Sequence, residues 1–472
     1  MLLLLVLFQF AGVILATWTL AGPLAQWRRN VAEARAERAG LPLTQDAFQE
    51  RYPPAPAEAD LAGELSAAAG AMDIRQDAWQ AYDRDYRDPD EPGVPQGAAL
   101  AVLRGAAASQ PEVVATLEAM DDRLVPGARA NWPRPHHDGP NGDLLLGRTL
   151  PHLSDQRALT NFQYARMLAA GGDGEWETGF KVLRQELART EAMAESEMLA
   201  EYLAAAGMEA KALRGAERLA TSLPPQAIGS AVEERALREL VSLLMQDQHG
   251  ANLRRGLEGE VVQTLDAMDG SIDPERLVRA LDQPAERAGM KALSADLAHW
   301  TARPIIDNDA AIYLDFLRAT IVALDAPTFV EFEQRAPSDD VVRELAESPM
   351  PHPFAAMLIP TTSRSAEAAY RNATHRRLIA AALAVRLYQA DNDGALPPDL
   401  EALVPTYLPS VPRDAMAADS AVRYDPERRR LWTAGENRQD DGGTASFELL
   451  KDNPTLGSRA LREASDHVIP LN

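Results

Sequence analysis

LYQADNDGALPPDLEALVPTYLPSVPRD, residues 387–414, decides how the C-terminal part of this chain folds. It begins with the end of an apolar helix. The polar run 391–394 then predicts a tight turn, because Asp and Asn side chains bond nearby backbone groups and Gly accepts a left-handed conformation. Pro398 suits the first turn of a second helix, whose positive end favours Asp399 and Glu401. The segment therefore predicts a helix, a turn, a second helix and an extended arm punctuated by prolines.

The flanking residues extend this segment into a small α+β unit. On the N-terminal side, apolar residues after Ser365 predict one long helix, onto which Leu403 is expected to fold back. On the C-terminal side, AVRY (421–424) and RLWTA (430–434) predict a β-hairpin, and residues 447–450 predict a third strand. We therefore expect residues 361–472 to form a compact α+β unit with a short antiparallel sheet.

This order of motifs resembles the globular domain of the major pseudopilins of type II secretion. The resemblance rests on the turn at 391–394, the helix LPPDLEALV (396–404), the arm YLPSVPRD (407–414), the hairpin and the polar loop that ends in Asp-Asp-Gly-Gly (440–443). It covers the C-terminal unit only. It implies a helical spine packed against an antiparallel sheet, and an association with secretion or pilus-like machinery.

Two departures separate the chain from an ordinary pilus subunit. In pseudopilins the spine continues directly from the N-terminal membrane helix, whereas here it begins near Ser365, far from the N-terminus. The family also follows its arm Asp with Pro, an aromatic residue and Gly, whereas Asp414 is followed by Ala415, Met416 and Ala417. We therefore expect the unit to be detached from the membrane helix that lets pseudopilins polymerise.

The resemblance also implies a calcium site in the loop after the hairpin. By that resemblance Asp440 and Asp441 would be the carboxylate ligands, and Glu436 and Asn437 could add side-chain oxygens. Calcium requires six to eight oxygen ligands, which such a loop can supply together with its carbonyl groups. The alternative is a solvated acidic turn that merely precedes two glycines.

Residues 131–360 are expected to form an α-helical array. QRALTNFQYARMLAAGGDGEWETGFKVLRQELART (156–190) predicts two helices separated by Gly-Gly-Asp-Gly, a layout similar to a tetratricopeptide-like hairpin. Further helices are expected near 191–222, 229–249, 259–268, 274–300 and 308–324. No dependable repeat at a fixed period follows. An irregular stack that buries Leu and Ala faces and a true repeat solenoid both stay open.

The N-terminal segment predicts a single transmembrane anchor at residues 1–27. No charge occurs from Leu2 to Gln26, a length that spans a hydrocarbon core of about 30 Å. A cleaved signal peptide is the alternative, but it normally has a basic start and a shorter apolar core. Residues 28–130 follow as an acidic membrane-proximal region in which prolines interrupt the helices, including one helix expected at 61–86.

Two features of the sequence predict opposite orientations of the anchor. Arg28 and Arg29 follow the span and nothing basic precedes it, so the positive-inside rule favours a cytoplasmic domain. The resemblance to pseudopilins favours the periplasmic side, where calcium is plentiful. We expect a single-pass protein of the bacterial inner membrane with a periplasmic domain; the excess of Arg over Lys and the abundant Ala are typical of a GC-rich bacterial genome.

Composition excludes several classes of function. The formal charge of −23 disfavours nucleic-acid binding, which needs a basic face to displace counterions from phosphates. The chain has no Cys, so disulfides, thiolate zinc sites and cysteine nucleophiles are excluded. The sequence also contains no HExxH, no GxSxG, no Walker loop and no dinucleotide-binding fingerprint.

Three functions remain. The first, which we prefer, is a non-enzymatic, membrane-anchored scaffold that binds other envelope proteins, including secretion components. The second is a metal-assisted hydrolase of the envelope built around His136, His137 and Asp138, the one dense histidine cluster; the alternative for these residues is an exposed loop. The third is a cytoplasmic-facing adaptor with tetratricopeptide-like helices.

Overall fold

The fold is that of a computed structural model of the 472-residue chain. It describes residues 2–86, 92–132, 150–246, 249–271, 288–338, 340, 344, 353–417, 421–435, 437–446, 448–449 and 465–471. The described part is mainly helical and carries one three-stranded antiparallel sheet. The predicted fold class is confirmed at this level.

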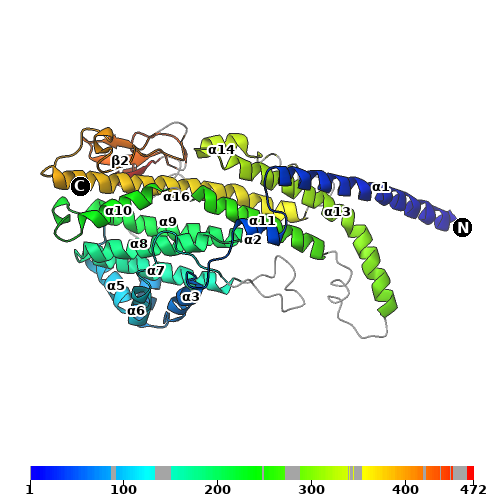
Figure 1. The fold of residues 1–472 in the computed structure, drawn as a ribbon, viewed down its shortest axis with the longest axis horizontal. Coiled ribbons are helices and arrows are strands. Elements are labelled where there is room, and N and C mark those ends of the chain that lie inside the picture. Colours follow the sequence, from blue (N-terminus) through cyan, green and yellow to red (C-terminus); the bar gives the residue numbers. More distant parts are fainter. Residues whose placement is uncertain are drawn as a thin grey trace.

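The helices, in chain order, are α1 (Leu2–Arg38), α2 (Gln45–Arg51), α3 (Ala62–Gly70), α4 (Asp77–Asp85), α5 (Gly97–Ala108), α6 (Pro111–Ala119), α7 (Pro151–Gly172), α8 (Trp176–Ala194), α9 (Leu199–Ser222), η2 (Pro225–Ala227), α10 (Glu234–Met245), α11 (His249–Ser271), α13 (Ala288–Ala323), α14 (Phe329–Arg335), α16 (Pro353–Asp391) and η4 (Glu401–Leu403). The strands are β1 (Arg423–Asp425), β2 (Arg430–Thr433) and β3 (His467–Pro470). In Figure 1 the helices α7 to α10 lie side by side beneath the long helix α16. The sheet sits on α16 at one end, and α1 and α13 extend beyond the body at the other.

The helical hairpin predicted at 156–190 is confirmed by α7 and α8. The turn between them is closed by the amide of Glu175, which donates to the carbonyl of Ala170 at 2.8 Å. Gly174 has a φ of +77°, which a residue with a side chain rarely adopts. The two helices share buried residues such as Met167 and Phe180. Around α7, the shorter helices α3 to α6 complete the N-terminal side of the array, and the helix expected at 61–86 is divided into α3 and α4.

Helix α13 differs from the expectation of two helices at 274–300 and 308–324. It is continuous through Pro304, although a proline inside a helix removes one hydrogen bond and usually ends or kinks it. Two contacts support the helix there: Arg303 pairs with Asp307 one turn later at 2.8 Å, and Gly22 of α1 lies against the Pro304 ring. Packing against α1 therefore outweighs the local preference for a break.

Helix α1 packs along α13 and is tied to it by charged side chains. Arg29 is buried and lies 3.1 Å from Asp307 of α13 and 2.7 Å from Asp269 at the end of α11. Within the residues that the structure describes, none of the helices has an apolar stretch of the length needed to cross a membrane. Most of the anchor predicted at 1–27, residues 1–18, lies outside the residues whose side chains are described.

Helix α16 is the spine predicted for the C-terminal unit, but it begins at Pro353 rather than near Ser365. The predicted boundary at 360 therefore falls within a helix. The spine ends as expected: Gly394, with a φ of +83°, donates its amide to the carbonyl of Gln389 at 2.8 Å. The second helix expected after Pro398 is reduced to the short 3₁₀ turn η4.

The sheet confirms the predicted hairpin and corrects the predicted third strand. Strands β1 and β2 pair antiparallel, with Tyr424 opposite Leu431, and β2 pairs with β3, with Leu431 opposite Ile469. Glu448 and Leu449, which were expected in the third strand, have helical backbone instead. The second partner of β2 is instead the segment 467–470, in which Val468 and Ile469 are both buried.

The C-terminal unit shares one hydrophobic core with the helical array. That core contains Leu219 of α9, Leu240 of α10 and Leu383 of α16, together with Leu431 and Ile469 of the sheet. A compact unit with a core of its own was expected, and the described residues correct this. The reason is that α16 buries apolar side chains all round: one face meets the sheet and the others meet α9 and α10.

Candidate functional site

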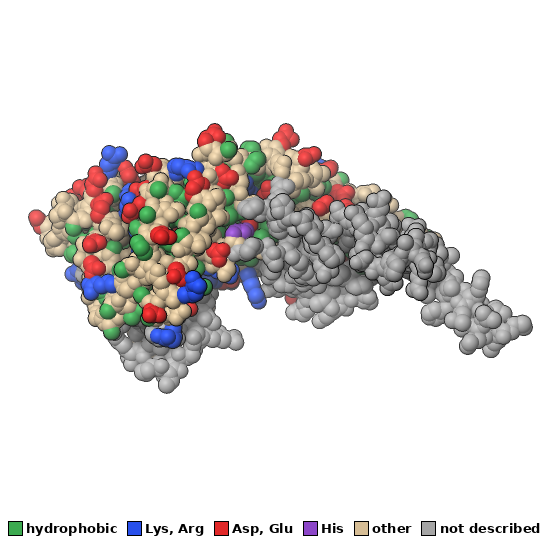
Figure 2. All heavy atoms as spheres, turned by 90° about the horizontal axis from the view of Figure 1, so that it is seen from below, with side chains coloured by type: hydrophobic (Ala, Val, Ile, Leu, Met, Phe, Trp, Pro, Cys, Tyr) green, Lys and Arg blue, Asp and Glu red, His purple; other side chains and the backbone are tan. Residues whose placement is uncertain are grey.

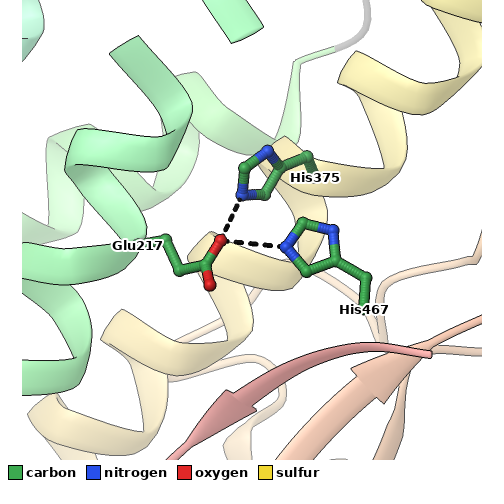
Figure 3. Close-up of side chains that lie close together, drawn as sticks. All are labelled: Glu217, His375 and His467. Carbon is green, nitrogen blue, oxygen red and sulfur yellow. Dashed lines mark hydrogen bonds and ion pairs between the residues drawn. The ribbon is translucent and has the colours of Figure 1, made fainter. Parts of the chain in front are cut away.

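Two histidines and one glutamate meet where the sheet joins the helical array. Oε2 of Glu217 lies 2.8 Å from Nε2 of His375 and 2.9 Å from Nε2 of His467. Figure 3 shows both rings directed at the same carboxylate. The ring centroids are 4.3 Å apart and the ring planes are tilted by 56°, so the two rings are not stacked. Both Nε2 atoms instead approach the same carboxylate oxygen. Among the described residues, this is the one group of three His or acidic side chains that is arranged to hold a metal ion.

Each member comes from a different element of the fold. Glu217 is on α9, His375 is on the middle of α16, and His467 is the first residue of β3. The helices α9 and α16 pack along each other, and β3 lies against both. The side chain of His375 is 8% exposed, that of Glu217 20% and that of His467 34%, so the group lies at the edge of the core and opens toward solvent on the β3 side.

The charges of the group are unequal. Burial, together with the charge of His467, lowers the pKa of His375 to about 4. Burial alone disfavours the charged form of His467, but the charge of Glu217 and its hydrogen bond raise the pKa of His467 above its ordinary value. Burial opposes ionisation of Glu217 too, yet the charge of His467 and the hydrogen bonds from both histidines hold its pKa well below the usual range. At neutral pH the group therefore contains a carboxylate, the neutral imidazole of His375, and the imidazole of His467, whose pKa lies above its ordinary value.

Sequence reasoning missed this group because its members are far apart in the chain. Glu217 is 158 residues from His375 and 250 residues from His467, so no ligand spacing exists to be found. The one local signal is a histidine just before the apolar run of the long helix, THRRLIAAALAVRL (374–387). A buried polar side chain at such a position needs a partner, but the sequence does not say which.

A second feature is an acidic cavity of about 790 Å³ between α1, the start of α2, the connection from α8 to α9, and α11. It is lined by seven acidic side chains and two arginines: Glu33, Glu37, Glu195, Glu197, Glu201, Asp266, Asp269, Arg29 and Arg255. Trp132 forms part of its wall and stacks on His152 with ring centroids 4.8 Å apart. The cavity thus combines excess negative charge with an aromatic surface.

The two arginines of this cavity are already paired. Arg29 binds Glu33 and Asp269 at 2.7 Å, and Arg255 lies 3.2 Å from Glu195. They neutralise part of the lining only, and the remaining carboxylates give the cavity a net negative charge. Figure 2 shows that acidic side chains are also scattered over much of the described surface on one face of the molecule. The net charge of the lining favours a cationic ligand.

The predicted calcium ligands Asp440 and Asp441 lie in one loop after β2, together with Asn437. Glu436 lies outside the described residues. Oδ1 of Asp440 accepts hydrogen bonds from Trp432 Nε1 at 2.9 Å and from the Gly442 amide at 3.0 Å. Asn437 donates to Asp441 at 2.7 Å. The structure thus brings three of the four predicted residues together.

An arginine occupies the position next to this loop. Nε of Arg423 lies 2.8 Å from Oδ2 of Asp440. Burial opposes ionisation of Asp440, but the hydrogen bonds from Trp432 and Gly442 and the charge of Arg423 lower its pKa. The carboxylate is thus satisfied by protein groups, and calcium would have to displace the guanidinium to reach it. The calcium site stays a prediction, and it now requires that calcium displace Arg423 from Asp440.

The alternative site at His136, His137 and Asp138 lies outside the described residues. Comparisons with protein-family models, with curated proteins and with solved structures found no match for this chain. The resemblances to pseudopilins and to tetratricopeptide-like hairpins therefore stay predictions.

Proposed function

We propose that this chain is a membrane-tethered scaffold of the bacterial envelope that binds a basic segment of a partner protein in the acidic cavity. The observation that carries the proposal is the lining of that cavity, in which seven carboxylate side chains face two arginines that are already paired. Residues 1–27 are the proposed anchor in the inner membrane. The proposed role is one of binding, without a chemical reaction.

The size of the cavity favours a short segment over a folded surface. At about 790 Å³ it falls within the range of pockets that enclose a small ligand or a few side chains. Lys and Arg side chains fit it by charge, and the Trp132 ring offers a surface for a cation. The formal charge of −23 on the whole chain would also attract such a segment from a distance.

The position of the cavity favours a partner near the membrane. Glu33 and Glu37 on α1 line it, and Glu37 follows Trp27 at the end of the proposed anchor by ten residues, about 15 Å along a helix. The partner would therefore meet the cavity close to the bilayer surface. By the resemblance of the C-terminal unit, components of the secretion machinery are the first candidates.

Binding of a fluorescent oligolysine peptide to the full chain in detergent tests the proposal. Replacing the exposed Glu37 and Asp266 (Glu37→Gln with Asp266→Asn) should weaken binding about fivefold, since each exposed charge pair contributes about 0.5 kcal/mol. The matched control, Glu401→Gln with Glu427→Gln, removes the same charge at exposed positions outside the cavity. Equal affinities of the two double variants would reject the cavity as the binding site.

The compartment is tested separately. An alkaline phosphatase reporter fused after Asn472 should be active, because this enzyme works only on the periplasmic side of the inner membrane. Activity of a cytoplasmic reporter at the same position would instead support the adaptor that faces the cytoplasm.

A further inference from the structure

We propose that Glu217, His375 and His467 bind one divalent transition-metal ion, with zinc the best fit, at the junction of α9, α16 and β3. This site is independent of the acidic cavity, which is lined by other residues. It is also distinct from the predicted calcium loop, because none of its three residues belongs to that loop.

The donor atoms are those that zinc prefers in the absence of thiolates. Two imidazole nitrogens and one carboxylate oxygen form a common three-ligand set for zinc, in which a water completes the tetrahedron. Calcium and magnesium require a larger set of oxygen ligands, and imidazole nitrogen is a poor ligand for both ions. The chain has no Cys, so a nitrogen and oxygen site is the one kind of zinc site that it can build.

The geometry requires a small adjustment only. In a tetrahedral zinc site with bonds of 2.0–2.1 Å, neighbouring ligand atoms lie about 3.3 Å apart. Here the carboxylate oxygen lies 2.8 and 2.9 Å from the two nitrogens, and all three ligand atoms lie within 4.8 Å of one another. Moving each nitrogen about 0.5 Å from the oxygen therefore makes room for the ion. Rotation of the Glu217 side chain, which is not fully buried, is sufficient for this.

Access and burial fit a bound ion as well. His375 is held in the core with 8% of its side chain exposed, whereas His467 is 34% exposed at the start of an edge strand. An ion can thus enter from the β3 side, where the side chain of His467 is the more exposed of the two histidines.

A bound ion would fasten the end of the chain to the helices. Strand β3 has four residues and pairs with β2 on one side only. Its first residue, His467, would be joined through the metal to two helices that are distant in sequence. Since binding to the folded state stabilises that state, the metal should raise the thermal stability of the full chain.

The competing explanation is a hydrogen-bonded triad that holds no metal. In that case one carboxylate oxygen accepts a hydrogen from each ring, and the geometry needs no further partner. A metal site predicts that one Zn²⁺ binds per chain, and the metal-free triad predicts that none binds there. The experiment therefore measures the stoichiometry of Zn²⁺ binding.

The test uses the full chain purified in detergent, stripped with a chelator and titrated with Zn²⁺ against a chromophoric competitor. We expect one ion per chain, and His467→Asn and His375→Asn should each weaken binding more than about tenfold, since even loss of a group behind a ligand costs 10- to 100-fold. The matched control is His152→Asn, because His152 also lies beside a glutamate, 3.0 Å from Glu201, but without a second histidine.

Substitution with Co²⁺ supplies an independent readout that does not depend on stability. A tetrahedral site with two nitrogens and one oxygen gives intense visible ligand-field bands, which His467→Asn should abolish and His152→Asn should leave intact. If circular dichroism shows that His375→Asn does not fold, the metal binding of His467→Asn, at the more exposed position, tests the proposal. Failure of the stripped, folded chain to bind one Zn²⁺, or equal binding by His467→Asn, would overturn the proposal in favour of the metal-free triad.

Discussion

Arg386 of α16 donates a hydrogen bond from Nη2 to the carbonyl oxygen of Thr221 at 2.8 Å, and its Nε reaches the carbonyl of Ala220 at 3.2 Å. These carbonyls lie in the last turn of α9, where a helix leaves carbonyl groups without intrahelical partners and where a positive charge is favoured. The side chain is almost fully buried, and this burial lowers its pKa to about 10. The spine of the C-terminal unit is therefore bonded to the helical array inside the shared core.

Replacement of this arginine by leucine should destabilise the full chain. Arg386→Leu leaves buried carbonyl oxygens of α9 without donors, which costs about 1–3 kcal/mol in the free energy of unfolding. Urea denaturation followed by circular dichroism measures the change. Arg371→Leu, at an exposed position of the same helix, is the matched control. A loss for Arg386→Leu no larger than that of the control would contradict the role assigned to this contact.

Truncation of Leu403 should be costly although it lies in a short 3₁₀ turn. Leu403 is fully buried and belongs to the core that α16 shares with α9 and α10. Leu403→Ala should lower the free energy of unfolding by about 2–5 kcal/mol, because it removes buried methyl groups and leaves a cavity. The exposed neighbour provides the comparison through Glu401→Ala. A change under about half a kcal/mol would mean that the turn does not pack on the spine.

The stability of the chain should respond to pH through Glu258. Its side chain is fully buried on α11, with Oε2 accepting a hydrogen bond from the Tyr52 hydroxyl at 3.1 Å, and burial raises its pKa. The folded state thus holds this proton more tightly than the unfolded state. The associated stability is present at low pH and is lost as the pH rises through the folded-state pKa.

The variant Glu258→Gln removes this dependence. The parent chain should lose stability as the pH rises from 4 toward 7, and the variant should not. The free energy of unfolding of Glu258→Gln should therefore increase relative to that of the parent over this range. Glu427→Gln controls for the change in net charge at an exposed position. A difference between Glu258→Gln and the parent that stays constant across this range would show that the pKa of Glu258 is the same in both states.

Calcium should raise the melting temperature of the full chain if the loop at 440–443 binds it. The full chain is needed because the C-terminal unit shares its core with the array. The effect should be lost in Asp440→Ala/Asp441→Ala, and Arg423→Gln should strengthen it, because the guanidinium competes for Asp440. Identical melting curves with calcium and with chelator would remove the metal from this loop and leave an acidic turn held by Arg423.

Local features were predictable because the residues that specify them are close in sequence. The turn at 391–394 follows from Asp, Asn and Gly, the β-hairpin from two apolar runs across a short turn, and the pair α7 and α8 from apolar periodicity on both sides of Gly-Gly-Asp-Gly. The predicted calcium residues lie together for the same reason. Each depends on neighbours within a few positions of the chain, and local propensity acts over that distance.

Features that depend on distant residues were not predictable in this way. The continuity of α13 through Pro304 depends on packing against α1, and the third strand is drawn from residues 467–470 because the edge of β2 needs a partner. Both outcomes oppose or ignore the local preference of the sequence. Tertiary contacts decide them, since burial of apolar surface and pairing of backbone groups outweigh propensities of about 1 kcal/mol for most residues and about 3 kcal/mol for proline.

The sequence by itself determined the helical class, the acidic charge, the absence of thiol chemistry, and the turn and hairpin of the C-terminal unit. Only the tertiary structure decided that this unit shares a core with the array, and that Glu217, His375 and His467 meet. The physical reason is that α16 is apolar on several faces, and sequence periodicity cannot say which neighbour covers each face. The same packing that covers α16 brings two distant histidines to one carboxylate.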